Sequence, residues 1–249
     1  MKMYKKPIWA DKFLVKLIKV ETEVIKEACV MFVKDIMTQN VRTINQNQTL
    51  LELQGLMRNE NLRRIPVVND AGQVVGIVTN TDVRQASPSE ASTLSRYEAS
   101  YLLSRIKVKD VMTHNVKTVF DHADLADVAA LMYQDRIASV PVLDENGNLC
   151  GIVTDTDVFR ALVDIFGLSQ TATRITLDVS DKPGVLAELG KLFADRGINI
   201  ISLVTNETKN LGNKEITLTV DLSQAGMDII EELREAGYSI VNIATSKVK

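Results

Sequence analysis

The sequence predicts a mixed α+β fold: two copies of a β-α-β-β-α unit packed as a pair, followed by a separate β-α-β-β-α-β domain. Three observations predict it. The 249-residue chain repeats itself at an offset of 75, each copy alternates strand and helix periodicity, and a different pattern begins near Thr173. A unit of this size makes a poor core alone, so we expect the two copies to bury their sheets face to face.

The duplication is direct. Val33–Thr38 returns as Val108–Thr113, and Gly76–Thr79 returns as Gly151–Thr154. Aligned without a gap, residues 33–84 and 108–159 share 21 of 52 positions. Chance identity would give a few, so the chain contains a duplicated domain.

Each copy indicates the same order of elements. An extended stretch (41–44; 116–119) precedes a helix, which is followed by two short apolar runs around a glycine-containing turn and a second helix near Thr79 or Thr154. The first helix is indicated by apolar positions at helical spacing: Leu50, Leu53, Leu56 and Met57, and in the second copy Leu125, Val128, Leu131 and Met132.

The repeated motifs D-h-M-T-x-N-V-x-T, h-P-V-h and G-I-V-T-x-T-D, where h is an apolar residue, resemble the CBS domain, and a tandem pair resembles a Bateman module. The resemblance covers about residues 33–165. It implies a first CBS domain at 31–86, a helical connector at 87–107 and a second CBS domain at 108–168.

The resemblance implies a nucleotide site built on Thr79 with Asp82, and on Thr154 with Asp157. A carboxylate can accept hydrogen bonds from a ribose diol, and a helix N-terminus offers N–H groups to an anion. The same spacing also fits a capping box, and both roles can coexist. The remaining nucleotide contacts expected from the family are Thr43, Ile44, Ile65, Pro66 and Val67, and Thr118, Val119, Val140, Pro141 and Val142.

Many CBS domains carry arginine just before the aspartate, where this chain has Thr81 and Thr156. The phosphate candidates are therefore the arginines near the expected cleft, although each can equally be a solvated surface residue. These candidates are Arg63, Arg64, Arg84 and Arg136. Arg63-Arg64 aligns with Ala138-Ser139, so we expect two unequal half-sites.

The connector is predicted to be a helix that opens with a capping box at 87–90 and places Leu94, Tyr97, Tyr101 and Leu102 on one side. The 85–89 stretch resembles the acetoin-utilisation protein B group, which joins a CBS pair to a C-terminal ACT domain. The helix either covers exposed sheet or forms a dimer or partner surface.

The C-terminal pattern predicts strands at 174–179, 198–204, 215–220 and 239–244, with helices following Gly184 and Gly226. This β-α-β-β-α-β order is ferredoxin-like. The residues D-K-P-G-V-L and F-A-D-R-G-I-N-I resemble an ACT domain, expected at 172–249.

The ACT resemblance implies a candidate amino-acid site at Asp181, Pro183, Gly184, Val185 and Asn199. Some serine-sensing members have asparagine where Asp181 stands. An aspartate there can hold an amine but repels a carboxylate. The alternative is that Pro183-Gly184 is only a tight turn and that the domain only dimerises.

Composition narrows the class of protein. The net charge of −3 does not favour a nucleic-acid binder, and no apolar run reaches the ~18 residues that span a bilayer. Cys29 and Cys150 form neither a disulfide framework nor a zinc motif, which favours the cytoplasm. Neither His114 nor His122 has a nucleophile partner motif, and there is no Walker loop.

The sequence thus predicts a cytoplasmic, non-enzymatic regulatory sensor with no catalytic residues, metal or required cofactor. Its regulatory ligand is expected to be AMP, ADP or ATP, with an amino acid as a second candidate ligand. We expect a homodimer that signals through its ACT domain or to a protein partner the sequence does not name. The alternatives are a cyclic di-AMP receptor and an enzyme of unrecognised type.

Residues 1–30 match neither domain. We expect this extension to be disordered or mis-annotated. Codons for Lys26-Glu27-Ala28 can form a ribosome-binding sequence ahead of Met31, which would then be the natural start.

Overall fold

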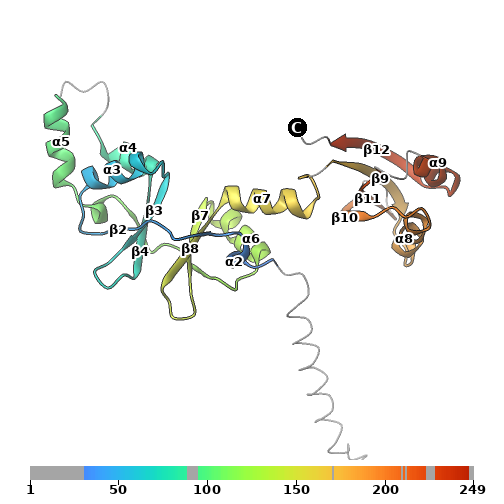
Figure 1. Ribbon diagram of the computed structural model, residues 1–249, viewed down its shortest axis with the longest axis horizontal. Helices are drawn as coiled ribbons and strands as arrows, with labels where there is room; N and C mark the ends of the chain where they lie inside the picture. The colour runs from blue at the N-terminus through green and yellow to red at the C-terminus, as the bar shows by residue number, and fades with distance from the viewer. Residues whose placement is uncertain are drawn as a thin grey trace, which may run out of the picture. The chain divides into compact units, whose positions relative to one another are not determined.

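The computed structural model describes residues 31–88, 95–169, 171–208, 210, 212–222 and 228–246. The predictions for residues 1–30 lie outside these. The chain divides into two units, Met1–Val158 and Phe159–Lys249, each of which is described by itself (Figure 1). Strands and helices are both present throughout, which confirms the mixed α+β fold.

The first unit contains both repeats. The first repeat comprises α2 (Val33–Ile36), β1 (Thr38–Gln39), β2 (Ile44–Asn45), α3 (Leu50–Asn59), β3 (Arg64–Val68), β4 (Val74–Thr79) and α4 (Asn80–Ala86). The second comprises η1 (Val108–Asp110), β5 (Thr113–His114), β6 (Val119–Phe120), α6 (Leu125–Asp135), β7 (Ser139–Leu143), β8 (Leu149–Thr154) and α7 (Asp155–Ile165). Helix α7 continues across the division into the second unit.

The two repeats exchange their first strands. One sheet has the order β2-β3-β4-β5 and the other β1-β8-β7-β6. Strand β5 of the second repeat therefore pairs with β4 of the first, with Gly76 opposite His114, and β1 pairs with β8. Residues 41–43 and 116–118, expected to be extended, precede the short parallel strands β2 and β6 and belong to neither. The exchange means that each sheet is completed by its neighbour.

The core of the first repeat is also completed by residues of the second repeat. Apolar side chains of α3, β3 and β4 pack with Val108 and Met112, which come from the start of the second repeat. In return, Val33 is fully buried and its N–H donates to the carbonyl of Ala123 at 3.0 Å. Burying one such side chain stabilises the fold by about 1.5–3 kcal/mol. The exchanged segments thus hold the two repeats together through apolar contacts as well as strand pairing.

The connector helix α5 (Arg96–Arg105) begins later than predicted. Its capping box joins Ser95 and Glu98, whereas Ser87 ends α4 and donates from its hydroxyl to the carbonyl of Val83. Part of the predicted box, residues 89–90, and Leu94 lie outside the described residues. Leu103 packs in the core, while the predicted face of Tyr97, Tyr101 and Leu102 is exposed. The face that the sequence singled out is thus open to solvent, and the opposite side of the helix packs through Leu103.

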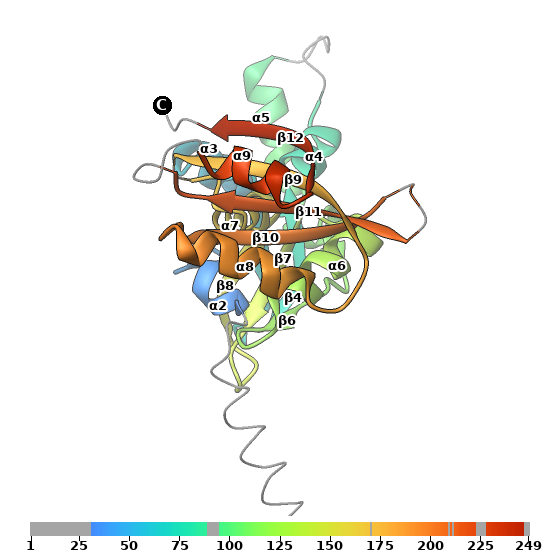
Figure 2. The same cartoon turned by 90° about the vertical axis from the view of Figure 1, so that its right-hand side faces the viewer.

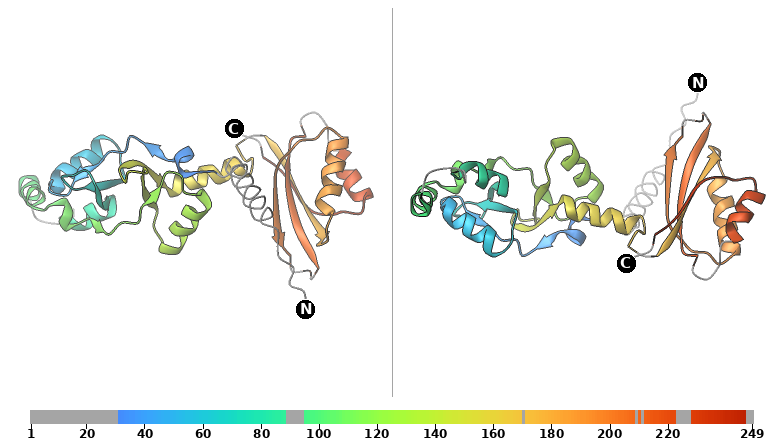
Figure 3. Two further views of the ribbon diagram at one scale, coloured as in Figure 1. Left: turned by 90° about the horizontal axis from the view of Figure 1, so that it is seen from below. Right: turned by 90° about the horizontal axis from the view of Figure 1, so that it is seen from above.

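The second unit is the expected β-α-β-β-α-β domain: β9 (Ala172–Ser180), α8 (Val185–Asp195), β10 (Ile200–Glu207), β11 (Asn213–Val220), α9 (Asp228–Glu235) and β12 (Ser239–Ser246). Its antiparallel sheet has the order β10-β11-β9-β12. Helices α8 and α9 cover one face, as Figures 2 and 3 show, and their apolar sides meet β9 and β11 around Phe193. Alternation along β9, with Ile175, Leu177 and Val179 buried, produces this face.

Among the described helices, none is long and apolar enough to cross a membrane.

Candidate functional site

A threonine and an aspartate three residues apart are hydrogen-bonded at the start of both α4 and α7, and at α4 the Asp82 N–H also donates to the Thr79 hydroxyl, which completes a capping box. At α4, the Oδ2 of Asp82 accepts hydrogen bonds from the N–H of Thr79 at 2.8 Å and from its hydroxyl at 2.7 Å. At α7, the Oδ2 of Asp157 accepts from the N–H and the hydroxyl of Thr154 at 2.9 and 2.7 Å. Local spacing explains both, since a residue three positions into a helix can reach back to the cap. The capping role is thus present at both predicted positions.

Each pair leaves one carboxylate oxygen available. In the described part of the chain, no hydrogen bond to the Oδ1 of Asp82 or Asp157 is formed. Asp157 is only 8% exposed, whereas Asp82 is half-buried. A carboxylate has about four acceptor positions, so it can cap its helix and still accept from a diol.

The expected base-contacting residues lie mostly inside the fold. Ile44, Ile65 and Val67 belong to the core between the first sheet and its helices. Val140 and Val142 are fully buried in the second repeat, and Pro66 and Pro141 are buried as well. Val119 is half-buried, and Thr43 and Thr118 are exposed. Strand alternation separates Pro66 and Pro141 from their neighbours, because adjacent side chains point to opposite faces.

Arg64 connects the two repeats. Its strand position lies opposite Thr79, and its guanidinium Nη1 is 3.4 Å from the Oδ1 of Asp155, which directly follows Thr154. One arginine therefore lies by both helix starts. Its counterpart at the offset of 75 is Ser139, and the counterpart of Asp155 is Asn80, so no second such pair can form. The surroundings of the two aspartates therefore differ in charge.

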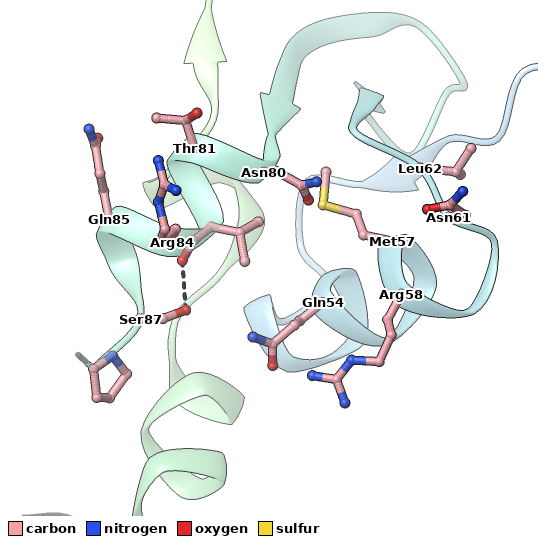
Figure 4. A pocket seen from close by; sticks show the side chains of 12 residues that line it. Gln54, Met57, Arg58, Asn61, Leu62, Asn80, Thr81, Arg84, Gln85 and Ser87 are labelled. Atoms are coloured by element: carbon pink, nitrogen blue, oxygen red, sulfur yellow. Dashed lines mark hydrogen bonds between the residues drawn. The ribbon is translucent and has the colours of Figure 1, made fainter. Parts of the chain in front are cut away.

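The other three candidate arginines take different places. Arg63 is exposed, and its backbone carbonyl accepts from the N–H of Asn80. Arg136 is exposed in the left-handed region, with φ 54°, where it ends α6. Arg84 lines a separate groove between α3 and α4 (Figure 4). Of the four, Arg64 alone forms an ion pair at these helix starts among the described residues.

The groove between α3 and α4 was not anticipated from the sequence. It has a volume of about 1120 Å³, and we call it the basic groove because its charged side chains are Arg58 and Arg84. Its lining residues are Gln54, Met57, Arg58, Asn61, Leu62, Asn80, Thr81, Val83, Arg84, Gln85, Ser87 and Pro88. The signal available in the sequence was the set of polar residues on the outward faces of two helices, which resembles ordinary solvated surface.

The loop of the C-terminal domain lines a pocket of about 430 Å³, which includes Asp181, Pro183, Gly184 and Val185. Gly184 caps α8 with φ 97°, a conformation that favours glycine. Asn199 is exposed and does not line this pocket. Four of the five predicted residues are therefore brought together.

Sequence reasoning missed Lys214 in this pocket. Its Nζ lies 3.1 Å from the Oδ2 of Asp181, and both side chains are about half exposed. The positive charge of Lys214 can offset the repulsion that we predicted between Asp181 and the carboxylate of an amino acid. The pairing depends on the register of β11 against β9, where Lys214 lies opposite Val179, and no local spacing encodes that register.

Among the described residues, no group of three or more His, Cys, Asp or Glu side chains is placed to hold a metal ion.

Two family models match the chain. The CBS domain model matches residues 33–89 and 108–164, and the AHAS small subunit-like ACT domain model matches residues 175–239.

Curated relatives match the tandem repeat. A CBS domain-containing protein of Dictyostelium discoideum is 32% identical over 136 residues, which are 54% of this chain and 93% of that protein. Homoserine O-acetyltransferase of Methanococcus vannielii is 31% identical over 130 residues, which are 52% of this chain. The chain spans only 24% of that enzyme's length.

Two solved structures are also similar. The chain is 28% identical to CBSX2 in complex with AMP, with a TM-score of 0.44, over 54% of this chain and 97% of that one. It is 27% identical to a structure described as an acetoin utilization protein from Vibrio cholerae, with a TM-score of 0.45, over 56% and 95%. The near-complete coverage of the Dictyostelium relative and the two family matches lead to one conclusion: the chain belongs to the CBS-domain family and carries a tandem CBS pair followed by an ACT-like domain.

Proposed function

We propose that this protein is a non-enzymatic regulatory sensor whose CBS pair binds an adenine nucleotide. The observation that supports this most is the pair of aspartates at the two helix starts, each with a carboxylate oxygen that the described residues leave without a hydrogen bond. In this proposal the ribose diol donates to Asp82 or Asp157, and the helix N-terminus meets the phosphate. The base would meet the family positions that are accessible, namely the exposed Thr43 and Thr118 and the half-buried Val119.

Arg64 gives the proposed site its sensitivity to charge. A phosphate placed between the two helix starts competes with Asp155 for the Arg64 guanidinium, which can bind phosphate with two parallel hydrogen bonds. The existing pair is long and part-exposed, so it holds the repeats together by no more than about 1 kcal/mol. Nucleotide binding would therefore exchange a contact between the repeats for a contact with the ligand, which changes the relative stability of two arrangements.

The ACT-like domain supports a second proposal, binding of a free amino acid in the pocket at Gly184. Asp181 would accept from the ligand amine, and Lys214 would donate to its carboxylate. Their exposed ion pair is worth about 0–1 kcal/mol, so a zwitterion can replace it at small cost. We also propose, as for the sensor as a whole, that the protein is a homodimer and is located in the cytoplasm.

Calorimetry with AMP, ADP, ATP and cyclic di-AMP tests the nucleotide proposal. We expect heat and a raised melting temperature with at least one adenine mononucleotide, with no turnover of it. Binding of cyclic di-AMP alone would favour the alternative receptor. No heat with any of the four would refute nucleotide sensing, and hydrolysis would revive the enzyme alternative.

A melting assay with the common amino acids tests the ACT-like domain. We expect one of them to raise the melting temperature of the wild type and to lose that effect in Lys214→Ala. Lys191→Ala, which removes an exposed lysine on α8, is the matched control and should respond like the wild type. An equal response of Lys214→Ala would contradict the proposed carboxylate contact.

A further inference from the structure

A methionine stands directly before each of the two exchanged strands. Met37 ends α2 ahead of β1, and Met112 precedes β5. The two methionines are equivalent at the offset of 75, and so are Gly76 and Gly151. Each methionine packs on the glycine of the other repeat, Met37 on Gly151 and Met112 on Gly76. The exchange of strands is therefore accompanied by a reciprocal pair of thioether contacts.

Both contacts exist because the partner is glycine. A Cβ at Gly76 would lie 2.6 Å from the Sδ of Met112, and a Cβ at Gly151 would overlap the Sδ of Met37. The Cγ and Cε of Met37 lie close to the same position. Gly151 is also the residue that pairs with Gln39 of β1. The end of the Met37 side chain thus covers the backbone at the point where the exchanged strand is held.

The two contacts differ in their access to solvent. Met112 is 7% exposed and belongs to the core of the first repeat, whereas Met37 is half-buried and belongs to neither core cluster of the described residues. Among the other methionines that the structure describes, Met57 and Met132 are buried and Met31 is half-buried. Met37 therefore combines access to solvent with a contact between the repeats.

We propose that Met37 is a site of reversible oxidation by hydrogen peroxide or an organic hydroperoxide, and that its oxidation loosens β1 from β8. The thioether sulfur donates an electron pair to one peroxide oxygen. An S–O bond forms as the O–O bond breaks, and the proton of the transferred oxygen passes to the leaving oxygen, which departs as water or as an alcohol. The sulfur loses two electrons and the peroxide gains them.

Oxidation changes the side chain from apolar to polar. A sulfoxide buried against the Gly151 backbone without a hydrogen-bond partner costs free energy, so the oxidised side chain favours solvent. Its departure removes the packing beside two paired positions, Thr38 with Ile152 and Gln39 with Gly151. This inference concerns a modification of the chain itself and does not rest on the ligand of the proposed function.

Timed exposure of the full-length protein to hydrogen peroxide, followed by peptide mass spectrometry, tests the site. Met37 should be oxidised at least about tenfold faster than Met112 in the folded protein, because Met112 reacts only when the core opens. In urea the two rates should become equal, since both side chains are then accessible. Equal rates in the folded protein, or faster oxidation of Met112, would overturn the assignment.

The melting temperature tests the consequence. Peroxide should lower it by about 3–8 °C in the wild type. Methionine sulfoxide reductases with a dithiol, which remove the oxygen as water while the dithiol becomes a disulfide, should restore it. Met37→Leu keeps an apolar side chain of similar volume and should not show the fall, whereas the matched control Met112→Leu should respond like the wild type. Complete oxidation of Met37 with an unchanged melting temperature, or an equal fall in Met37→Leu, would refute the inference.

Discussion

Replacing Asp157 by alanine removes a carboxylate with two proposed roles, in stability and in nucleotide binding. The free energy lost through each role can be estimated separately. The stabilising role is to accept from the N–H and hydroxyl of Thr154 at 2.9 and 2.7 Å. Loss of such a cap costs about 1 kcal/mol, and leaving its partly buried donors without an acceptor raises the total to about 2 kcal/mol. For a unit of this size, the melting temperature should fall by about 4–8 °C.

The substitution should affect nucleotide binding more strongly than it affects stability. A ribose diol that donates to the carboxylate forms hydrogen bonds to a charged group, each worth about 1.5–3 kcal/mol. Asp157→Ala or Asp82→Ala, whichever removes the occupied half-site, should raise the Kd for the nucleotide by at least about tenfold. Titration calorimetry with each single variant measures this directly.

Glu52→Ala is the matched control. Glu52 accepts from the N–H and hydroxyl of Thr49, both at 2.7 Å, in the same kind of box, but at the start of α3 and without a predicted ligand role. It should lower the melting temperature and leave the Kd unchanged. If Asp82→Ala and Asp157→Ala raise the Kd no more than Glu52→Ala does, the two aspartates act only as caps and the ribose assignment is wrong.

Three further predictions concern other parts of the CBS pair. Arg64→Ala should weaken AMP binding by about tenfold and leave adenosine binding unchanged, because a charge-assisted phosphate contact is lost; equal loss for both ligands in calorimetry would contradict the competition with Asp155. Gly76→Ala should destabilise the protein by about 1–3 kcal/mol, because a Cβ there would lie 2.7 Å from a backbone oxygen of the exchanged strand β5. Gly55→Ala on α3, where a Cβ would meet nothing within 4 Å, should stabilise the protein by about 0.5–1 kcal/mol. Urea titration of both variants measures the two changes, and a Gly76→Ala protein more stable than the Gly55→Ala protein would contradict this packing. Hydrogen bonds from Thr49, first from the backbone N–H and then from the hydroxyl, lower the pKa of Glu52 below 4.5. The stability that ionised Glu52 contributes is therefore present above pH 4.5 and is lost as pH falls through the lowered pKa. Glu52→Gln should make the melting temperature depend less on pH in that acid range, and an unchanged dependence on pH would exclude this contribution.

The local features were readable from the sequence. Identity at the offset of 75 located the two repeats, and apolar periodicity located their helices and strands. The hydrogen-bonded pairs at Thr79 and Thr154 could be predicted because their partners lie three residues away, where helical geometry alone sets the contact. Order and spacing likewise indicated the ferredoxin-like domain and the strand-to-helix turn at Gly184.

Contacts between distant segments were decided only by the tertiary structure. The exchange of β1 and β5 follows from how the chain crosses between repeats, and no residue type marks it. Arg64 meets Asp155 from 91 positions away, and Lys214 reaches Asp181 through strand register. The duplication and the order of helices and strands could be predicted from the sequence because periodicity and caps are local, and its motifs resemble a CBS pair followed by an ACT domain. Which charges face each other across the pair, and where its groove lies, required the folded chain, because those depend on contacts between segments remote in sequence.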